Sequence, residues 1–135
     1  MSSAGYSGTP LAKKLGIKEG HNIKLIGIPD NYYDLFDNFP VDIKCEENEL
    51  KDFIHVFSKS WVELECLLPQ LRKDIVQNGM IWVSWPKKAS KVDTDISEDL
   101  IREFALSIGL VDVKVCAIDN IWSGLKLVIP VKLRR

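Results

Sequence analysis

The sequence predicts a single three-layer α/β domain over residues 1–135, with a mostly parallel sheet that ends in an antiparallel hairpin. Three observations predict it. Short apolar segments alternate with amphipathic helical segments, as in right-handed βαβ crossovers. Two of the apolar segments, residues 53–57 and 80–85, are almost uninterrupted, which is typical of strands covered on both faces. The last two apolar segments are joined by a connection that only an antiparallel pair can use.

Composition places the chain among soluble globular proteins with one core. Apolar residues make up 46%, charged residues 27%, and the net charge is -1. A nucleic-acid binder usually carries a basic excess, so we expect no nucleic-acid partner. No apolar run approaches the roughly 18 residues of a membrane span, and the first residues lack the features of a signal peptide. We therefore expect a cytoplasmic protein without membrane contact, and its oligomeric state stays open.

The first part of the chain predicts two strands and two short helices. Residues 10–16 read as a helix that Thr9 caps and Gly16 ends. Residues 22–28 form the first strand, and a weak helix follows over residues 32–36. Residues 41–45 alternate strictly between apolar and charged side chains, which predicts a half-exposed second strand near a sheet edge.

The middle of the chain predicts a buried strand followed by a long helix. Residues 53–57 form the third strand. Ser60 caps a helix that runs to about Asn78, where an Asn-Gly pair ends it. An interior proline costs about 3 kcal/mol, so Pro69 predicts a kink or a break near Cys66.

The last part predicts a central strand, a helix and the closing hairpin. The fourth strand begins at Met80. A helix capped by Asp95, with Ser97 as the competing cap, ends at Gly109, and strands at residues 111–115 and 125–131 complete the sheet. The most hydrophobic strands belong in the centre, so we expect the strand order 2-1-3-4-6-5 with one antiparallel strand.

Cysteine and histidine residues predict no metal site. Cys45, Cys66 and Cys116 are far apart and lie in apolar-periodic segments, which favours buried free thiols. His55 lies within the apolar residues 53–57 and has no cysteine or carboxylate at ligand spacing. An interior histidine with satisfied hydrogen bonds is the simpler interpretation, and a catalytic role is its alternative.

The best candidate for a ligand site is the end of the fourth strand. Trp85 is followed by Pro86, Lys87 and Lys88, and ligands of open α/β sheets bind at such strand ends. Two lysines could hold a phosphate or a carboxylate, and a tryptophan could stack on a ring or a cation. The alternative is that Trp85 packs in the core while the lysines face solvent.

Five further residues join these ligand-binding candidates. Lys59 ends the neighbouring strand, and Ser90, two residues after Lys88, could add a hydroxyl donor. The other three lie in the hairpin tip: Asp119, Trp122 and Ser123. Trp122 could form one wall of a ligand site or contact a protein partner, and it could equally fold back over the sheet. The glycine-containing residues 5–9 could cradle an anion, or they could be an arm that caps the first helix. No catalytic residue and no metal ligand is predicted.

The loop after the first strand predicts no cofactor. Nucleotide sites of this type need several glycines there, so that the backbone can approach phosphates at a helix N-terminus. Only Gly27 is present, and Pro29 lacks the backbone N–H that could bind an anion. Walker-type, HExxH, CxxC and GxSxG motifs are all missing from the sequence.

Three stretches resemble an uncharacterised bacterial family that is known only as a domain of unknown function. They are residues 5–17, residues 82–90, and residues 109–119 with their continuation through 122–126. Together they span nearly the whole chain. The resemblance implies no catalytic residues, because the family has no established activity.

A more distant similarity concerns the order of elements. Residues 53–131 are similar to the C-terminal half of class I S-adenosylmethionine methyltransferases, which also finish with a helix, a long strand and an antiparallel return strand. This similarity implies a Rossmann-like fold. An acidic residue that would hold the ribose of the cofactor is not evident, and Glu46 and Glu47 are the nearest stand-ins.

Two main functional hypotheses follow. The first is a small cytoplasmic, non-enzymatic Rossmann-like domain with a degenerate cofactor loop, which binds a small anionic ligand or a protein partner. The alternative is an enzyme, a divergent S-adenosylmethionine-dependent methyltransferase. A third, structural hypothesis is a homodimer formed through the exposed edge of the terminal hairpin.

Overall fold

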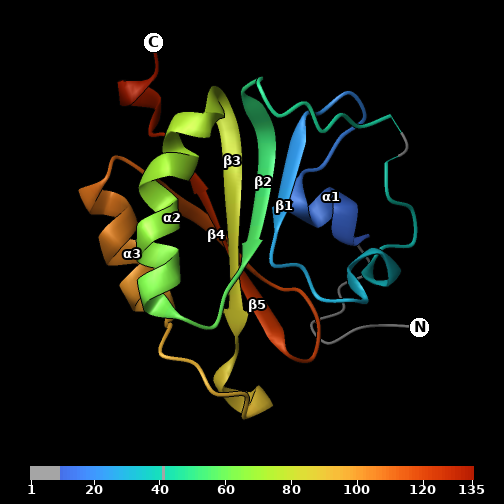
Figure 1. The fold of residues 1–135 in the computed structure, drawn as a ribbon, viewed down its shortest axis with the longest axis vertical. Helices are drawn as coiled ribbons and strands as arrows, with labels where there is room; N and C mark the ends of the chain where they lie inside the picture. Colours follow the sequence, from blue (N-terminus) through green and yellow to red (C-terminus); the bar gives the residue numbers. More distant parts are fainter. Residues whose placement is uncertain (1–9, 41) are drawn as a thin grey trace.

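The computed structural model of the chain describes residues 10–40 and 42–135 and contains a five-stranded sheet with helical segments on both faces (Figure 1). The strands lie in the order β1-β2-β3-β5-β4. Their bounds are β1 (Ile23–Ile26), β2 (Lys51–Phe57), β3 (Ile75–Pro86), β4 (Val111–Ala117) and β5 (Trp122–Val128). The predicted α/β fold class is therefore confirmed.

The sheet is mixed, so the prediction of a mostly parallel sheet is wrong. β1 pairs with β2 and β2 pairs with β3 in parallel, whereas β3 pairs with β5 and β5 pairs with β4 in antiparallel fashion. The hairpin accounts for this result. Its second strand lies directly against β3, so half of the neighbouring pairs run in opposite directions.

The predicted six-stranded order 2-1-3-4-6-5 is also wrong, because residues 42–45 form no strand and residue 41 lies outside the described part. Only one isolated bridge, between Asn22 and Lys44, joins this segment to the sheet. The Asn22 side chain then holds the chain in a turn. Its amide donates to three backbone carbonyls of residues 46–50, and its oxygen accepts from the Glu46 N–H at 2.9 Å. This turn leads the chain away from β1 and into β2.

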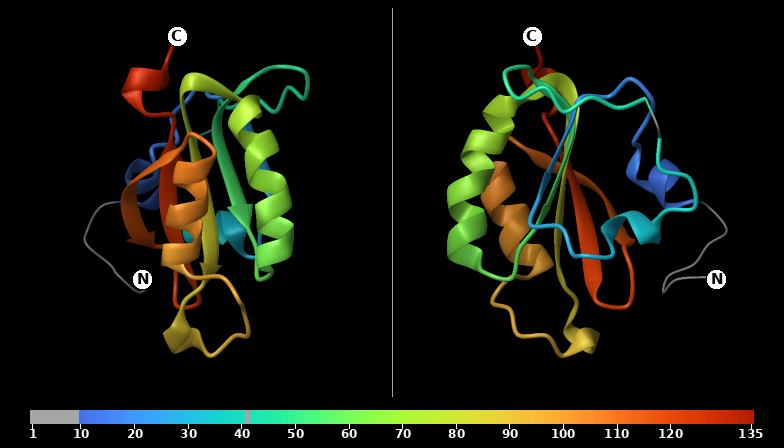
Figure 2. Two further views of the ribbon diagram at one scale, coloured as in Figure 1. Left: turned by 90° about the vertical axis from the view of Figure 1, so that its left-hand side faces the viewer. Right: turned by 45° about the vertical axis from the view of Figure 1, so that its right-hand side comes forward.

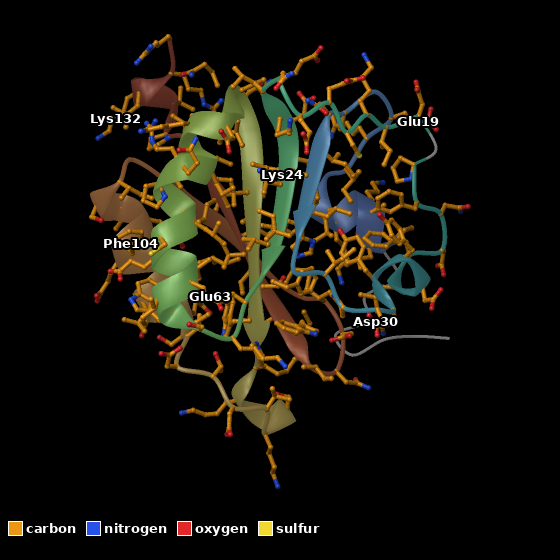
Figure 3. The ribbon with its side chains drawn as sticks, viewed as in Figure 1. Glu19, Lys24, Asp30, Glu63, Phe104 and Lys132 are labelled. Carbon is orange, nitrogen blue, oxygen red and sulfur yellow. The ribbon has the colours of Figure 1, made fainter. Side chains whose placement is uncertain are left out.

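Helices α2 (Trp61–Asp74) and α3 (Glu98–Ser107) cover one face of the sheet (Figure 1). The Ser60 hydroxyl accepts from the N–H of Glu63, as the capping pattern predicts. Phe104 of α3 meets Trp61 of α2 edge-to-face, with ring centroids 5.7 Å apart, and Figure 3 labels Phe104 on the outer helix. Apolar residues of both helices pack with every second residue of the central strands in one continuous core cluster.

The sequence predicts a kink or a break near Cys66, and the break is wrong because helix α2 is continuous. Pro69 lies inside the helix, which ends at Asp74 rather than near Asn78. The next residue, Ile75, already pairs with Lys51 in the sheet. Ile75 and Met80 pair with β2 on either side of a register shift, so residues 75–79 belong to the strand and tertiary contacts override the local helix signal.

The opposite face is covered by short segments, helix α1 (Leu11–Leu15) and the 3-10 turn η1 (Tyr32–Leu35), as Figure 2 shows in its right-hand view. Gly16 ends α1 with φ +88°, the left-handed conformation that the sequence predicts there. Trp82 of β3 ties α1 to the sheet, because its indole N–H donates to the Leu15 carbonyl at 2.7 Å. The predicted cap Thr9 and the predicted loop of residues 5–8 lie outside the described residues.

The cysteines differ from the sequence-based expectation of three buried thiols. Only Cys116 is buried, whereas Cys45 and Cys66 are exposed. Cys45 lies in the segment that forms no strand, and Cys66 lies on α2 away from the core residues Leu64 and Leu68. Burial raises the pKa of the Cys116 thiol, and nearby lysines oppose this shift.

Candidate functional site

A pocket of about 430 Å³ lies at the carboxyl end of β3, beneath the loop that leads to α3. Figure 1 shows this loop at the foot of the sheet, where the arrows of β2 and β3 end. The pocket is lined by the end of β3, the start of β5 and three loop lysines: Trp85, Pro86, Ser123, Lys87, Lys88 and Lys91. The structure thus brings Trp85, Lys87 and Lys88 together at one sheet edge.

Local hydrogen bonds shape the pocket loop. β3 stops at Pro86, and the Lys87 N–H donates to the carbonyl of Ile121 at 2.8 Å. The Ser90 hydroxyl donates to the Lys87 carbonyl at 2.7 Å and accepts from the Val92 N–H at 3.2 Å. Ser90 is therefore committed to the turn, and it lies outside the pocket lining.

Positive charge dominates the pocket. Its two carboxylates belong to Asp93 and Glu98, and Glu98 pairs with Arg102 of α3. Within residues 10–40 and 42–135 the three pocket lysines form no ion pair. Trp85 supplies an apolar wall and is 7% exposed. This arrangement suits a small ligand that carries an anionic group beside a flat or apolar part.

Trp122 does not share the pocket with Trp85. In the β3–β5 pair, Trp85 lies opposite Ser123 and Pro86 lies opposite Trp122. Successive residues of a strand point to opposite faces, so the two tryptophans belong to different core clusters. Trp122 packs edge-to-face on Phe57 at a centroid distance of 5.0 Å, which matches the expectation that it could fold back over the sheet.

Two other candidates also lie outside the pocket lining. The Asp119 carboxylate accepts from the N–H groups of Ile121 and Trp122, each at 2.8 Å, and so shapes the hairpin tip. Lys59 is exposed, and its carbonyl accepts the Thr94 hydroxyl at 2.8 Å. Of the eight residues that the sequence singles out, the pocket lining includes four: Trp85, Lys87, Lys88 and Ser123.

The sequence analysis did not single out Lys91 and Asp93 of the pocket lining. Both belong to the polar loop that follows the central strand. A signal was available, because a polar loop at the carboxyl end of a buried strand borders the edge where ligands bind in open α/β sheets. Lys91 also adopts φ +62°, a conformation that non-glycine residues rarely take and that side-chain type alone does not predict.

The usual ligand crevice of such sheets lies between strands whose connections leave on opposite faces. Here these strands are β1 and β2. β1 leads to η1, where Tyr32 packs in the cluster on the α1 face, and β2 leads to α2, where Leu64 packs in the cluster on the other face. The crevice between their carboxyl ends therefore begins at Gly27 and Phe57.

The backbones of the two strands approach closely where this crevice begins, although Gly27 itself is exposed. A Cβ atom on Gly27 would lie 2.5 Å from the carbonyl oxygen of Phe57, so the two backbones are in direct contact. The segment after Gly27 includes Pro29 and forms only a four-residue 3-10 turn. It therefore offers no row of free N–H groups at a helix start for a phosphate.

Glu46 and Glu47 lie at the wrong end of the sheet to hold a ribose in this crevice. The backbone of Glu46 is hydrogen-bonded to the side chain of Asn22, which precedes β1. These carboxylates therefore belong to the amino end of β1, whereas the crevice opens at its carboxyl end. Glu46 and Glu47 are therefore excluded as the carboxylates that would hold the ribose of the cofactor.

His55 has the interior position that the sequence predicts. Its ring nitrogens contact the Tyr32 hydroxyl at 3.1 Å and the Ser84 hydroxyl at 2.8 Å, and both His55 and Ser84 are fully buried. Burial lowers the pKa of His55 to about 3. The ring is neutral at physiological pH and has no access to a ligand, so it stabilises the core.

Neither a metal centre nor a membrane helix is found in the described part of the chain. No group of three or more histidine, cysteine, aspartate or glutamate side chains there could hold a metal ion. No described helix is long and apolar enough to cross a bilayer.

Comparison with solved structures reveals the fold. A ribosomal protein L11 methylase from Lactobacillus delbrueckii subsp. bulgaricus matches with a TM-score of 0.56 at 11% identity, over 85% of this chain and 72% of that one. A SAM-dependent methyltransferase from Aquifex aeolicus matches with a TM-score of 0.54 at 14% identity, over 88% of this chain and 87% of that one. LepI in complex with SAM matches with a TM-score of 0.52 at 9% identity, over 88% of this chain and 39% of that one. The chain has a methyltransferase fold. No family model and no curated protein matches the sequence.

These likenesses confirm the distant architectural similarity and correct the leading functional prediction. The hypothesis of a non-enzymatic ligand- or protein-binding domain is contradicted, because solved structures with this fold include a ribosomal protein L11 methylase and a SAM-dependent methyltransferase.

The cofactor of this fold, S-adenosylmethionine, does not fit the crevice between β1 and β2. Gly27 is the single glycine of the loop there, and Glu46 is tied to Asn22 at the other end of β1. The pocket at β3 has a different donor set. Its lysines could hold a carboxylate, and the Ser123 hydroxyl and the Asp93 carboxylate could bind hydroxyl or amino groups.

Proposed function

We propose that the chain is a divergent S-adenosylmethionine-dependent methyltransferase whose ligand site is the pocket at the carboxyl end of β3. The observation that carries this proposal is the lysine- and tryptophan-lined pocket at the ligand-binding edge of a methyltransferase fold. Its volume lies in the range of roughly 300–1,000 Å³ that is typical of small-molecule sites.

The pocket residues would divide the task of binding. Lys87, Lys88 and Lys91 would neutralise the carboxylate of the ligand, since lysine ammonium groups act as strong point charges for anions. Trp85 would provide a flat apolar wall for a ring. Ser123 of β5 is the direct cross-strand partner of Trp85, and its hydroxyl would orient a polar group of the ligand.

Calorimetry with S-adenosylmethionine and with its demethylated product tests the proposal. We expect saturable heat for the wild-type chain at ligand concentrations up to about millimolar, and affinity about tenfold weaker in Lys87→Ala. That loss corresponds to one charge-assisted hydrogen bond. The absence of heat with both ligands would remove the methyltransferase hypothesis.

Lys59→Ala is the matched control. Lys59 is an exposed lysine at the end of the neighbouring strand, but it does not line the pocket. Its removal changes the net charge as Lys87→Ala does, and we expect affinity within about twofold of the wild type. If both variants lose affinity equally, general electrostatic attraction and not the pocket would explain the binding.

Membership of the uncharacterised bacterial family and a cytoplasmic location are also part of this proposal. They rest on the motif stretches and on the composition of the sequence. The ligand-binding role of Lys59, Ser90, Asp119 and Trp122 is not included, since the pocket lining does not contain them.

A further inference from the structure

Two lysines face each other across the terminal hairpin. Lys114 of β4 and Lys126 of β5 are direct partners in the antiparallel pair. Like charges in directly opposed positions destabilise a sheet. This pair therefore has a cost for the fold.

Helix α1 brings further positive charge to the same place, because Lys14 and Lys114 both lower the pKa of the Cys116 thiol against the effect of burial. The Lys114 ammonium donates to the Lys14 carbonyl at 2.9 Å, and the Lys126 nitrogen lies 3.9 Å from the point where Gly16 would carry a Cβ. Burial, Lys114 and Lys18 all lower the pKa of Lys126, so these charges act on one another. We call Lys14, Lys18, Lys114 and Lys126 the lysine cluster.

No carboxylate neutralises the lysine cluster. The ion pairs of the described residues all involve Arg102, and one of them ties up Asp112, two residues before Lys114 on β4. Glu19 is exposed, follows Lys18 in sequence and forms no ion pair there (Figure 3). The residues outside the described part, 1–9 and 41, include no aspartate or glutamate.

The cluster is accessible and separate from the β3 pocket. Lys18 and Lys114 are exposed, whereas Lys14 and Lys126 are half-buried. None of the four residues lines the pocket at Trp85. A partly desolvated ammonium group binds an anion more strongly than a fully solvated one, because the surrounding dielectric constant is lower.

We propose that the lysine cluster binds a small ligand that carries two or more phosphate groups. Several ammonium groups around one spot match the multiple charges of such a ligand. The cluster is confined to four side chains in a chain of net charge -1, without the extended basic stripe that a nucleic-acid backbone requires. This site is independent of the proposed methyltransferase activity.

Titration with inorganic pyrophosphate at low salt tests the site. We expect saturable binding to the wild-type chain, and at least about tenfold weaker binding to Lys114→Met and to Lys126→Met. Lys132→Met is the matched control, because Lys132 is an exposed lysine in the C-terminal turn, far from α1 (Figure 3). We expect its affinity to stay within about twofold of the wild type.

A second measurement separates a binding role from a structural one. Without pyrophosphate, Lys126→Met should melt about 1–3 °C above the wild type, because the repulsion from Lys114 and Lys18 is removed. A lower melting temperature in Lys126→Met would mean that the lysine stabilises the fold, and it would overturn the proposal. So would the absence of pyrophosphate binding to the wild type, or equal weakening in Lys132→Met.

Discussion

Replacement of Gly27 by alanine is expected to lower the free energy of unfolding by about 3 kcal/mol. Two effects combine in this loss. The backbone of Gly27 has φ +66°, where a side chain is strained, and the new Cβ would lie 2.5 Å from the Phe57 carbonyl oxygen. That oxygen belongs to the backbone of β2, so it cannot rotate away as a flexible side chain could. Urea denaturation followed by circular dichroism measures the loss.

Gly20→Ala is the control that isolates the contact. Gly20 also has a positive φ, +87°, but a Cβ there would meet no atom within 4 Å. We expect this variant to lose only about 1 kcal/mol, the backbone term alone. Equal losses in the two variants would show that the carboxyl ends of β1 and β2 are less tightly closed than the Gly27–Phe57 contact indicates.

Acidification from about pH 7.5 to about pH 5 is expected to remove about 2 kcal/mol of stability through His55 alone. Burial lowers the pKa of His55 to about 3 in the folded chain, whereas the unfolded residue titrates near 6.5. Between these values the unfolded state binds the extra proton, so stability falls as the pH falls. Chemical denaturation at a series of pH values measures this slope.

His55→Phe separates this effect from other titrations. The variant is expected to be less stable at neutral pH, because the hydroxyls of Tyr32 and Ser84 lose their buried partner, but its slope between these pH values should be smaller. His21→Gln is the control and should keep the slope, since His21 is only half-buried and lies outside the core cluster. An unchanged slope in His55→Phe would contradict the assignment.

Local signals predicted the elements whose side chains and caps are adjacent in sequence. Ser60 and Glu63 form the predicted helix start, and Gly16 has the predicted left-handed conformation. The nearly continuous apolar residues 53–57 form a central strand with both faces covered. Each of these outcomes depends on residues within a few positions of one another, so the pattern alone was sufficient.

The failures arose where a distant residue decided the outcome. Residues 42–45 have the alternation of a strand, yet Asn22 binds the backbone just beyond them and turns the chain away from β1. Residues 75–78 have a helical pattern, yet they belong to β3, because Ile75 pairs with Lys51 of β2 and Met80 pairs with Phe53. Hydrogen bonds to residues far away in the sequence outweigh local propensity. A short stretch of sequence does not include these partners, so it cannot predict the outcome.

For the candidate site, the sequence by itself determined that Trp85, Lys87 and Lys88 lie at the end of a buried strand, and hence at the sheet edge where ligands bind. Only the tertiary structure decided which candidates share a pocket. The register that sets Trp85 opposite Ser123 places Trp122 on the other face, and side chains alternate between faces with every residue. Strand pairing thus selected Ser123 for the pocket and excluded Trp122, because register is a relation between strands that neither segment encodes alone.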